Sequence, residues 1–409
     1  MDETLYWCWL QQAMRCGARV DEALAAFGSP KAIYESSEYE RRISGAFTIK
    51  QMERLKEEPL RRAEEILNTC ARYSIAVLTP DDARYPQMLR PLPNYPCVLY
   101  VRGDADVLRE TCAIAVVGAR KASDYAVQAA YSLSFALSRA GMTVVSGGAL
   151  GIDSAAHRAA MDAGGKTVCY LGCGFGVRYL MENSPLRREI SEHGALVSEY
   201  PPGTPAGKST FPIRNRLISG SSLGTLVVEA GVKSGSLITA KGAREMGRDV
   251  FAVPGNILTS TFDGANQLIR DGAKPVFSAR DILEEYDARF PDKLDMSAAD
   301  VPITPPAVEK PVPRQKAPAA RRAQRPAAER TPKPAEAETV NQKIKNLPAE
   351  ATDEMRQVFQ AVSGSALRAD EITERTGIPM RNLLRVLTQL EVMGYIVQQQ
   401  GKKYLASKE

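Results

Sequence analysis

The chain has 409 residues, too many for one ordinary domain, so two or three folded units are expected. Its hydrophobic content of 44% and charged content of 25% are typical of a soluble globular protein. No apolar run approaches the roughly 20 residues that cross a bilayer, and the start MDETLYWCWLQQAM lacks the basic and apolar regions of a signal peptide. We therefore expect a cytoplasmic protein without a membrane span.

The net charge of +5 is unevenly distributed along the chain. Residues 301–350 carry ten Lys and Arg against five Asp and Glu, so the rest of the chain is electrically balanced. An anion-binding surface on the folded parts must therefore come from local clustering of cations.

Residues 1–72 are predicted to form a helical domain. Apolar residues recur at helical spacing in the segments 5–14 and 55–67, and the turn residues 28–30 separate helices. This composition favours packing or protein contacts over catalysis.

Residues 73–298 alternate between strand and helix signals. Short apolar runs end in Gly or Ser turns at 113–117, 143–145, 167–171 and 226–228, with amphipathic stretches between them. This alternation predicts an α/β domain with a doubly wound parallel sheet. Because ligands bind at the carboxyl ends of such strands, the loops that follow them should meet at one edge.

Residues 299–347 are predicted to form a flexible, basic linker rich in Pro and Ala. Ten of the 26 prolines lie between 301 and 350, with almost no large apolar residue. The segment could hold nucleic acid non-specifically or act only as a solvated spacer.

Residues 348–409 are predicted to form a winged-helix domain. Three helical stretches, at 353–362, 370–376 and 379–393, precede two short strands that would form the wing. Arg381 and Arg385 lie four apart on the third helix, where they could meet DNA. Protein docking remains an equal alternative, because a fold does not fix a function.

The segment 208–240, KSTFPIRNRLISGSSLGTLVVEAGVKSGSLITA, is the strongest binding signal. It places cations around one aromatic ring and then opens a helix with small residues, whose free N–H groups can receive an anion. Cations beside a ring suit a polymer of phosphates and flat bases. The candidate residues are Lys208, Phe211, Arg214, Asn215, Arg216, Ser234, Gly235 and Ser236. Of the two arginines, one is expected to contact phosphate and the other to be structural.

Two earlier loops are expected to join this surface. In VVGARKASDY, Gly118 ends a strand and Arg120 lies in the following turn. In VVSGGALGIDSAAH, Ser146, Gly147 and Gly148 form a loop whose backbone can approach a ligand closely.

The titratable residues predict neither catalysis nor a metal site. Asp153 is expected to cap the following helix, and His157 to be a packed side chain because no third catalytic partner is evident. Glu229 is expected to pair with a nearby Arg or Lys. The cysteines, of which Cys169 and Cys173 are closest, form no C-x-x-C motif, so reduced thiols are expected. No G-x-G-x-x-G spacing occurs, so no dinucleotide cofactor is expected.

Seven motifs occur in order along the middle of the chain: VVGAR, SGGALGIDSAAH, LVSEYPPG, FPIRNRLISG, VVEAGVKSGSLITA, GRDVFAVPG and NQLIRDGA. Together they resemble the bacterial DNA-processing protein family DprA, also called Smf, over most of residues 75–280. The helical start and the winged helix fit the layout of that family. Three positions depart from its common pattern: Ala119 replaces Ser, Leu150 replaces Arg and Leu180 replaces Pro. The first two departures remove side chains that could contact phosphate.

The resemblance implies a non-catalytic protein that binds single-stranded DNA without sequence preference and needs no cofactor. It implies an extended Rossmann-like central domain that forms a homodimer. It also implies loading of RecA onto DNA during natural transformation, or competence, and recombination, with single-strand-binding protein as a further partner. In the matching motifs, Arg120 and Lys208 correspond to phosphate contacts and Phe211 to a base contact. Loops of the family that cradle phosphate correspond to Ser146, Gly147 and Ser234–Ser236.

Two other functions are weighed against this one. The central domain is similar to the LOG-like nucleotide phosphoribohydrolases, which carry PGGxGTxxE at the equivalent strand. Here residues 221–225 replace the start of that motif, and Glu229 falls one residue late, so its carboxylate would miss the reacting atom. The second alternative, a transcription regulator that binds double-stranded DNA, is supported by the winged helix alone.

Overall fold

The computed structural model describes residues 3–300 and 351–406, apart from 365 and 400–402. The described residues form two compact units, one in each range. The expected linker lies almost wholly outside the described residues. Within the described ranges no helix is long and apolar enough to cross a membrane. All seven cysteines lie in described residues and none forms a disulfide bond; six are buried and Cys16 is half-buried.

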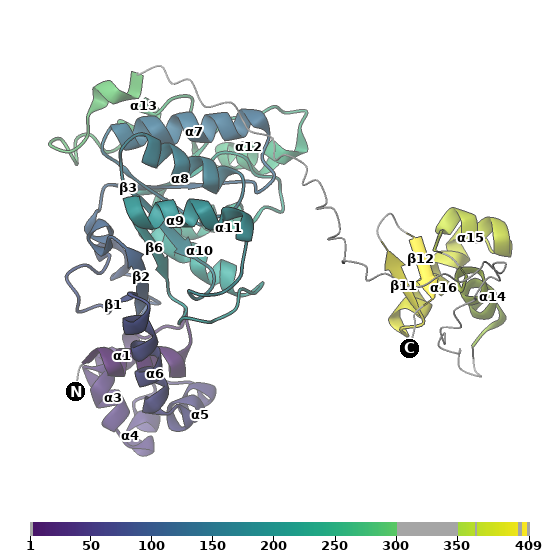
Figure 1. Cartoon of the computed structure of the whole chain (residues 1–409), viewed down its shortest axis with the longest axis horizontal. Coiled ribbons are helices and arrows are strands. Elements are labelled where there is room, and N and C mark those ends of the chain that lie inside the picture. Colours follow the sequence, from purple (N-terminus) through teal and green to yellow (C-terminus); the bar gives the residue numbers. More distant parts are fainter. Residues whose placement is uncertain (1–2, 301–350, 365, 400–402, 407–409) are drawn as a thin grey trace, which may run out of the picture. The chain divides into compact units, whose positions relative to one another are not determined.

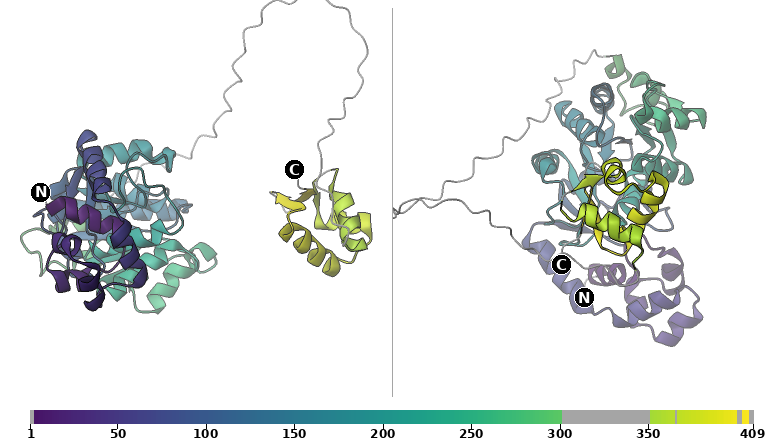
Figure 2. Two further views of the ribbon diagram at one scale, coloured as in Figure 1. Left: turned by 90° about the horizontal axis from the view of Figure 1, so that it is seen from below. Right: turned by 90° about the vertical axis from the view of Figure 1, so that its right-hand side faces the viewer.

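The first unit begins with the expected helices: α1 (Glu3–Met14), α2 (Asp21–Phe27), α3 (Pro30–Glu35), α4 (Glu38–Ile43), α5 (Ile49–Glu57) and α6 (Leu60–Arg72). Hydroxyl side chains define several of their starts, because Ser29, Ser37 and Thr48 each accept a hydrogen bond from a backbone N–H of the first turn. Their apolar faces pack around Trp7 and Trp9 and continue into the α/β part through Tyr100. These helices, purple in Figures 1 and 2, lie at one end of the α/β part.

A nine-stranded sheet forms the centre of the unit, in the order β1-β2-β6-β5-β4-β3-β7-β8-β9. Its strands are β1 (Ala76–Leu78), β2 (Leu99–Gly103), β3 (Ala113–Val117), β4 (Thr143–Ser146), β5 (Thr167–Leu171), β6 (Ala195–Ser198), β7 (Gly224–Val227), β8 (Asp249–Ala252) and β9 (Lys274–Pro275). From β6 to β9 every pair is parallel, whereas β1 and β2 are antiparallel additions. The predicted parallel, Rossmann-like sheet is confirmed, with five strands that the sequence did not predict.

Helices cover both faces of the sheet, as the doubly wound prediction requires (Figure 1). They are α7 (Asp124–Arg139), α8 (Ile152–Asp162), α9 (Ser184–His193), α10 (Thr210–Gly220), α11 (Gly235–Glu245), α12 (Asp263–Arg270) and α13 (Arg280–Leu283). Strand β3 shows the alternation: Ile114 and Val116 pack with α7 and α8, while Ala115 and Val117 pack with α10 and α11. Because β4 and β7 flank β3, the chain reverses its direction of winding there.

The second unit contains α14 (Asp353–Val362), α15 (Ala369–Thr376) and α16 (Met380–Val392), with strands β10 (Leu367–Arg368), β11 (Ile396–Gln399) and β12 (Lys403–Ala406). The order β10-β12-β11 adds one strand to the predicted two-stranded wing, and the winged helix is confirmed. Arg385 is exposed and lies 3.4 Å from Glu354 in an ion pair. The side chain of Arg381 lies outside the described residues.

Candidate nucleic-acid interface

A cavity of about 410 Å³ opens at the carboxyl ends of β3 and β7. This is the point at which the winding reverses, and open α/β sheets bind ligands there. The end of β3 and the turn after it contribute Val117, Gly118 and Arg120, and the segment after β4 contributes Ala149 and Asp153. The remaining lining residues lie between 208 and 218, mainly on α10, and between 234 and 239, at the start of α11. Nine of the thirteen predicted site residues line the cavity: Gly118, Arg120, Lys208, Phe211, Arg214, Asn215, Ser234, Gly235 and Ser236.

The ring of Phe211 lies near two cations, Arg120 from the turn after β3 and Arg214 from its own helix α10. It is half-buried, as expected, and its centroid lies 5.4 Å from the guanidinium carbon of Arg120 and 6.0 Å from that of Arg214. Tyr179 packs beside it, with the ring centroids 5.3 Å apart. A Cβ at Gly172 would come within 2.6 Å of the Phe211 ring, so this glycine leaves the space that the ring occupies. The ring therefore packs against Gly172 and Tyr179 and also forms part of the cavity wall.

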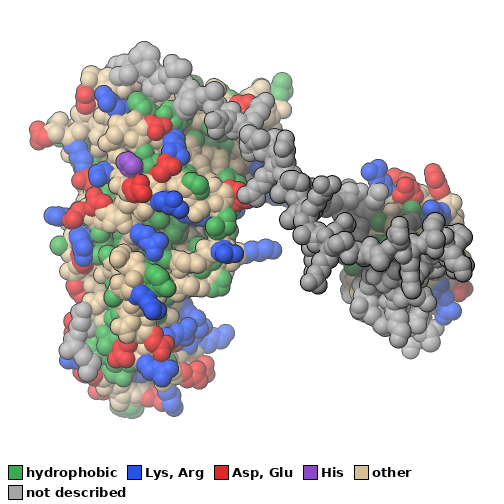
Figure 3. All heavy atoms as spheres, in the orientation of Figure 1, with side chains coloured by type: hydrophobic (Ala, Val, Ile, Leu, Met, Phe, Trp, Pro, Cys, Tyr) green, Lys and Arg blue, Asp and Glu red, His purple; other side chains and the backbone are tan. Residues whose placement is uncertain are grey.

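Lys208 and Arg120 are the exposed cations of the site. Both side chains are exposed, and neither has an ion-pair partner within residues 3–300 or 351–406. Over the face drawn in Figure 3, Lys and Arg are interspersed with Asp and Glu. The positive charge at this cavity is therefore local, as the balanced charge of the folded parts requires.

Arg214 is buried and holds the loop that follows β4. It donates hydrogen bonds to the carbonyl oxygens of Gly147, at 2.7 Å, and Tyr170. A Cβ at Gly147 would lie 2.6 Å from the guanidinium nitrogen Nη1, so only glycine permits this approach. Arg214 reaches the cavity wall, but its donors are largely used within the protein.

Ser146, Gly147 and Gly148 do not line the cavity, which is a correction to the expected phosphate-cradling loop. The hydroxyl of Ser146 donates to the carbonyl oxygen of Val116 at 2.6 Å and is fully buried. The N–H of Gly147 donates to Asp153. All three residues are buried, and Gly147 among them accepts the hydrogen bond that holds Arg214.

Asp153 lines the cavity floor and is not a helix cap. The N-cap of α8 is Gly151, with φ at +75°, and Asp153 lies inside the first turn. Its Oδ2 accepts hydrogen bonds from the N–H groups of Gly147 and Ala149, both at 3.2 Å. Burial raises the pKa of this carboxyl, while Arg214 and these N–H groups oppose the rise. The sequence suggested a cap because Asp is common near helix starts, but the left-handed glycine takes that position.

The first turn of α11 lines the cavity with the backbone of Ser234, Gly235 and Ser236. Ser234 is its N-cap and accepts a hydrogen bond from the N–H of Ser236, and the two hydroxyls are 2.7 Å apart. Gly235 between them has open space where a Cβ would be. An anion in the cavity would meet the N–H groups of this turn and the positive end of the helix dipole.

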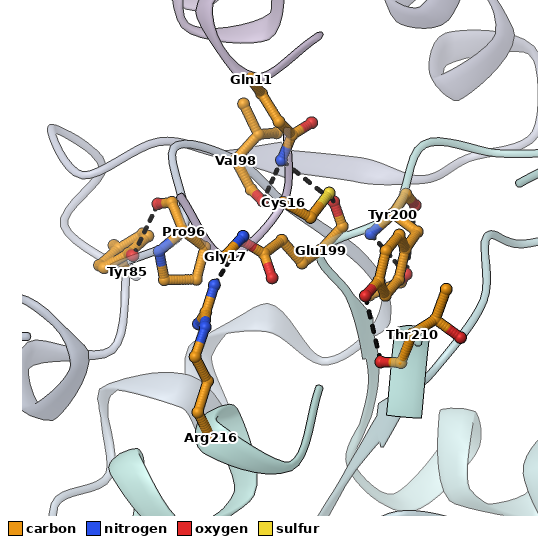
Figure 4. Close-up of polar contacts among 11 residues, drawn as sticks. Gln11, Cys16, Gly17, Tyr85, Pro96, Val98, Glu199, Tyr200, Thr210 and Arg216 are labelled. Atoms are coloured by element: carbon orange, nitrogen blue, oxygen red, sulfur yellow. Dashed lines mark hydrogen bonds and ion pairs between the residues drawn. The ribbon is translucent and has the colours of Figure 1, made fainter. Parts of the chain in front are cut away.

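Arg216 lies outside the cavity, which is a second correction. Successive residues of α10 point to different sides, so Phe211, Arg214 and Asn215 face the cavity while Arg216 faces the N-terminal helices. Its Nη2 lies 2.6 Å from Glu199 Oε1, and the two side chains are 9% and 2% exposed (Figure 4). Of the two arginines, Arg216 therefore has the structural role that the sequence could not assign.

Neither of the candidate acid or base residues is placed for chemistry at the cavity. Glu229 is 1% exposed, and its Oε2 accepts hydrogen bonds from the N–H and hydroxyl of Ser123, both at 2.8 Å. It therefore stabilises the start of α7. The expected pairing of Glu229 with an Arg or Lys is not found among the described residues. His157 is fully buried, in agreement with its prediction as a packed residue. Within the described residues no cluster of His, Cys, Asp or Glu is arranged to hold a metal ion.

Comparison with known proteins gives consistent results along the chain. The profile of the family described as DNA recombination-mediator protein A matches residues 76–287, which is half of the chain. The chain belongs to this family. The profile of the DprA winged helix domain matches residues 342–402.

Individual DprA relatives extend the match. Protein Smf of Synechocystis is 31% identical over 330 residues, which cover 80% of this chain and 79% of that protein. DNA processing protein DprA of Bacillus subtilis is 42% identical over 206 residues, covering 50% of this chain and 69% of its own length. The X-ray structure of DprA from Streptococcus pneumoniae superposes with a TM-score of 0.59 at 34% identity, covering 68% of this chain and 95% of that one. The chain is thus similar to DNA-processing proteins through its α/β domain.

Sequence reasoning missed part of the cavity lining: Val117, Ala149, Asp153, Pro212, Ile218, Ile238 and Thr239. Helical spacing was the signal that could have found some of them. Ile218 lies four residues after Arg214, and Thr239 lies three after Ser236, so each shares a helix face with a predicted residue.

Proposed function

We propose that this protein binds single-stranded DNA, without preference for sequence, in the cavity at the carboxyl ends of β3 and β7. The phosphates contact Arg120, Lys208 and the N–H groups at the start of α11, and a base stacks on Phe211. The observation that carries this proposal is the convergence on one cavity of Arg120, from the turn after β3, with Lys208 and Phe211, from the start of α10 and the residues just before it. Membership of a DNA-processing family supports it.

The chemistry of the cavity favours a single strand over a duplex. A base can stack on Phe211 only if its face is free, which a duplex does not allow without unstacking. Every base has such a face, so the contact is tolerant of sequence. The cations and helix N–H groups recognise phosphate, and neutralising each phosphate releases counterions, so affinity falls steeply with salt. Arg216, Ser146, Gly147 and Gly148 contribute only through the residues that they support.

The proposal is tested by fluorescence anisotropy with a labelled 20-nucleotide single strand and the matching duplex. We expect tighter binding of the single strand, a steep loss of affinity with salt, and similar affinities for strands of different sequence. Equal or tighter binding of the duplex would instead favour a regulator that acts through the winged helix.

We further propose, from family membership, that the protein loads RecA onto the bound strand during natural transformation and recombination. This role includes homodimerisation through the Rossmann-like domain, displacement of single-strand-binding protein and a cytoplasmic location. The test is RecA ATPase activity on single-stranded DNA coated with single-strand-binding protein. Addition of this protein should shorten the lag, and a Lys208→Ala variant should not.

We propose that the protein acts without catalysing a reaction. The burial of Glu229 and its hydrogen bonds to Ser123 support this, because the carboxylate needed by a LOG-like phosphoribohydrolase is absent from the cavity wall. Incubation with nucleoside monophosphates should release no free base. Release that depends on Glu229 would overturn this part of the proposal.

A further inference from the structure

The side of α10 opposite the cavity is attached to the N-terminal helices by a group of residues, here called the Glu199 cluster: Gln11, Gly17, Glu199 and Arg216 (Figure 4). Glu199 follows β6, and its Oε1 accepts hydrogen bonds from Arg216, at 2.6 Å, and from the N–H of Gly17, at 3.0 Å. Its carbonyl oxygen accepts a hydrogen bond from Gln11 at 3.0 Å. One carboxylate therefore joins the DNA-facing helix to the N-terminal helical domain.

Direct packing reinforces this attachment. Gly17 has φ at +79°, and a Cβ there would come within 2.9 Å of Ile213 Cγ2 on α10. The backbone of the N-terminal domain thus lies against the helix one residue before Arg214. At the start of α10, the hydroxyl of Tyr200 donates to the carbonyl oxygen of Thr210 at 3.1 Å.

The buried ion pair is sensitive to small displacements of α10. Glu199 and Arg216 are almost fully enclosed, and Glu199 Oε2 and Arg216 Nε and Nη1 make no hydrogen bond with described residues. Desolvation is costly for both charges, and their mutual attraction offsets it only in good geometry. A shift of α10 would lengthen the single 2.6 Å contact and leave both charges buried without compensation. The pair therefore restrains the helix more tightly than apolar packing of the same size would.

The cavity depends on that restraint. Phe211, Arg214 and Asn215 all reach the cavity from α10, whereas Arg120 reaches it from the turn after β3. The 5.4 Å separation of Phe211 and Arg120 is thus a distance between two separately anchored elements. A displacement of about 1 Å in a binding constellation is enough to loosen it.

We propose that Glu199 is a positioning residue for single-strand binding: through Arg216 and Gly17 it fixes α10 against the N-terminal helical domain. That domain therefore contributes to DNA affinity without contacting DNA. The inference rests on the proposed function, because it concerns the same cavity. By reciprocity, DNA bound at α10 stabilises the contact of the N-terminal domain with the helix.

The first test uses the full chain with Glu199→Gln, with Glu199→Gln combined with Arg216→Gln, and with Glu189→Gln as control. Glu189 forms a half-exposed ion pair with Arg158 outside the cavity and the Glu199 cluster. We expect Glu199→Gln to weaken single-strand binding at least fivefold with an unchanged salt slope, since no phosphate contact is lost. The double variant also lacks the restraint on α10, so it should bind no more tightly than Glu199→Gln, again with an unchanged salt slope. Glu189→Gln should not differ from the original protein, and normal binding by the double variant would show that the pair is not needed for positioning.

Two further results would overturn the inference. One is a Glu199→Gln protein that melts at a lower temperature but binds DNA with unchanged affinity, which would make the pair merely structural. The other is a double variant that stays weak and shows a shallower salt slope, which would make Arg216 a phosphate contact.

A second measurement does not require a folded variant. Hydrogen exchange of the unsubstituted protein is followed with and without a saturating oligo(dT) strand, and we expect the amide of Gly17 to exchange more slowly when DNA is bound. If DNA slows exchange in α11 but leaves exchange at Gly17 unchanged, the proposed coupling between DNA binding and the N-terminal domain is contradicted. Lys208→Ala, measured in parallel, separates this failure from failure of the proposed function: if Lys208→Ala binds normally, the cavity itself is misassigned.

Discussion

Replacement of Phe211 by Ala tests the base contact most sharply, because one ring is removed and every cation stays. Phe211, on α10, is the aromatic side chain that lines the cavity. Its removal should therefore abolish the stacking of one base. Stacking of a base on an aromatic side chain contributes ~1–3 kcal/mol. At about 1.4 kcal/mol per tenfold change, we expect roughly 5- to 150-fold weaker binding of single-stranded DNA.

The ring also packs above Gly172 and beside Tyr179, so its removal costs some stability. Because Phe211 is only half-buried, this cost stays below the ~3–5 kcal/mol typical of a buried Phe. The assay is anisotropy with a labelled 20-nucleotide strand at several salt concentrations, on protein shown to be folded by circular dichroism. The salt slope should not change, because no phosphate contact is removed.

Two control variants accompany this measurement. Phe211→Tyr keeps the ring and should bind within a fewfold of the original protein. Tyr39→Ala removes an aromatic side chain that is 71% exposed on α4 and should have no effect. Binding by Phe211→Ala within twofold of the original protein would refute the stacking contact.

Three further predictions follow from the same geometry. Lys208→Gln should weaken binding to all sequences alike and reduce the salt slope by about one, without a change in melting temperature, because the exposed ammonium contacts only phosphate. His157 should make stability depend on pH: burial lowers its pKa from 6.5 to about 3, so its contribution is complete above pH 6.5 and is lost as the pH falls towards 3. Between pH 6.5 and pH 5, the free energy of unfolding measured with urea should fall by about 2 kcal/mol more for the original protein than for His157→Gln. Equal falls in the two proteins would refute the assignment. Gly151→Ala should lower the free energy of unfolding by at least about 1 kcal/mol, because its φ is +75° and the new Cβ would lie 2.3 Å from the carbonyl oxygen of Ala119; an unchanged urea midpoint would contradict this.

The parallel sheet and the cavity edge were predictable because their signals are local. Runs such as 113–117 are buried on both faces and end in small residues, and such strands in a doubly wound fold bring their loops to one edge. The strands β1, β2 and β6 carried no clear pattern. They are short, and two of them are added by antiparallel pairing, β2 with β6 and β1 with β2, which local propensity does not report.

The roles of the buried polar residues were not predictable for a different reason. Arg214 and Arg216 are two residues apart in the same motif, and only the packing of the N-terminal helices decides which of them is enclosed. The partner of Arg216 lies 17 residues earlier, and Gly17 lies in another domain. Asp153 likewise binds a loop whose shape depends on the left-handed Gly151. Such contacts depend on tertiary structure, so residue type and spacing do not specify them.

The central claim is that a base of single-stranded DNA lies against Phe211. Photo-crosslinking with an oligonucleotide that carries 5-iodouracil, followed by mass spectrometry of the digested protein, tests it most directly. We predict crosslinks in the peptide that contains Phe211, with loss of that adduct in Lys208→Gln at high salt. Crosslinks confined to the winged-helix domain, with none in residues 208–220, would contradict the account.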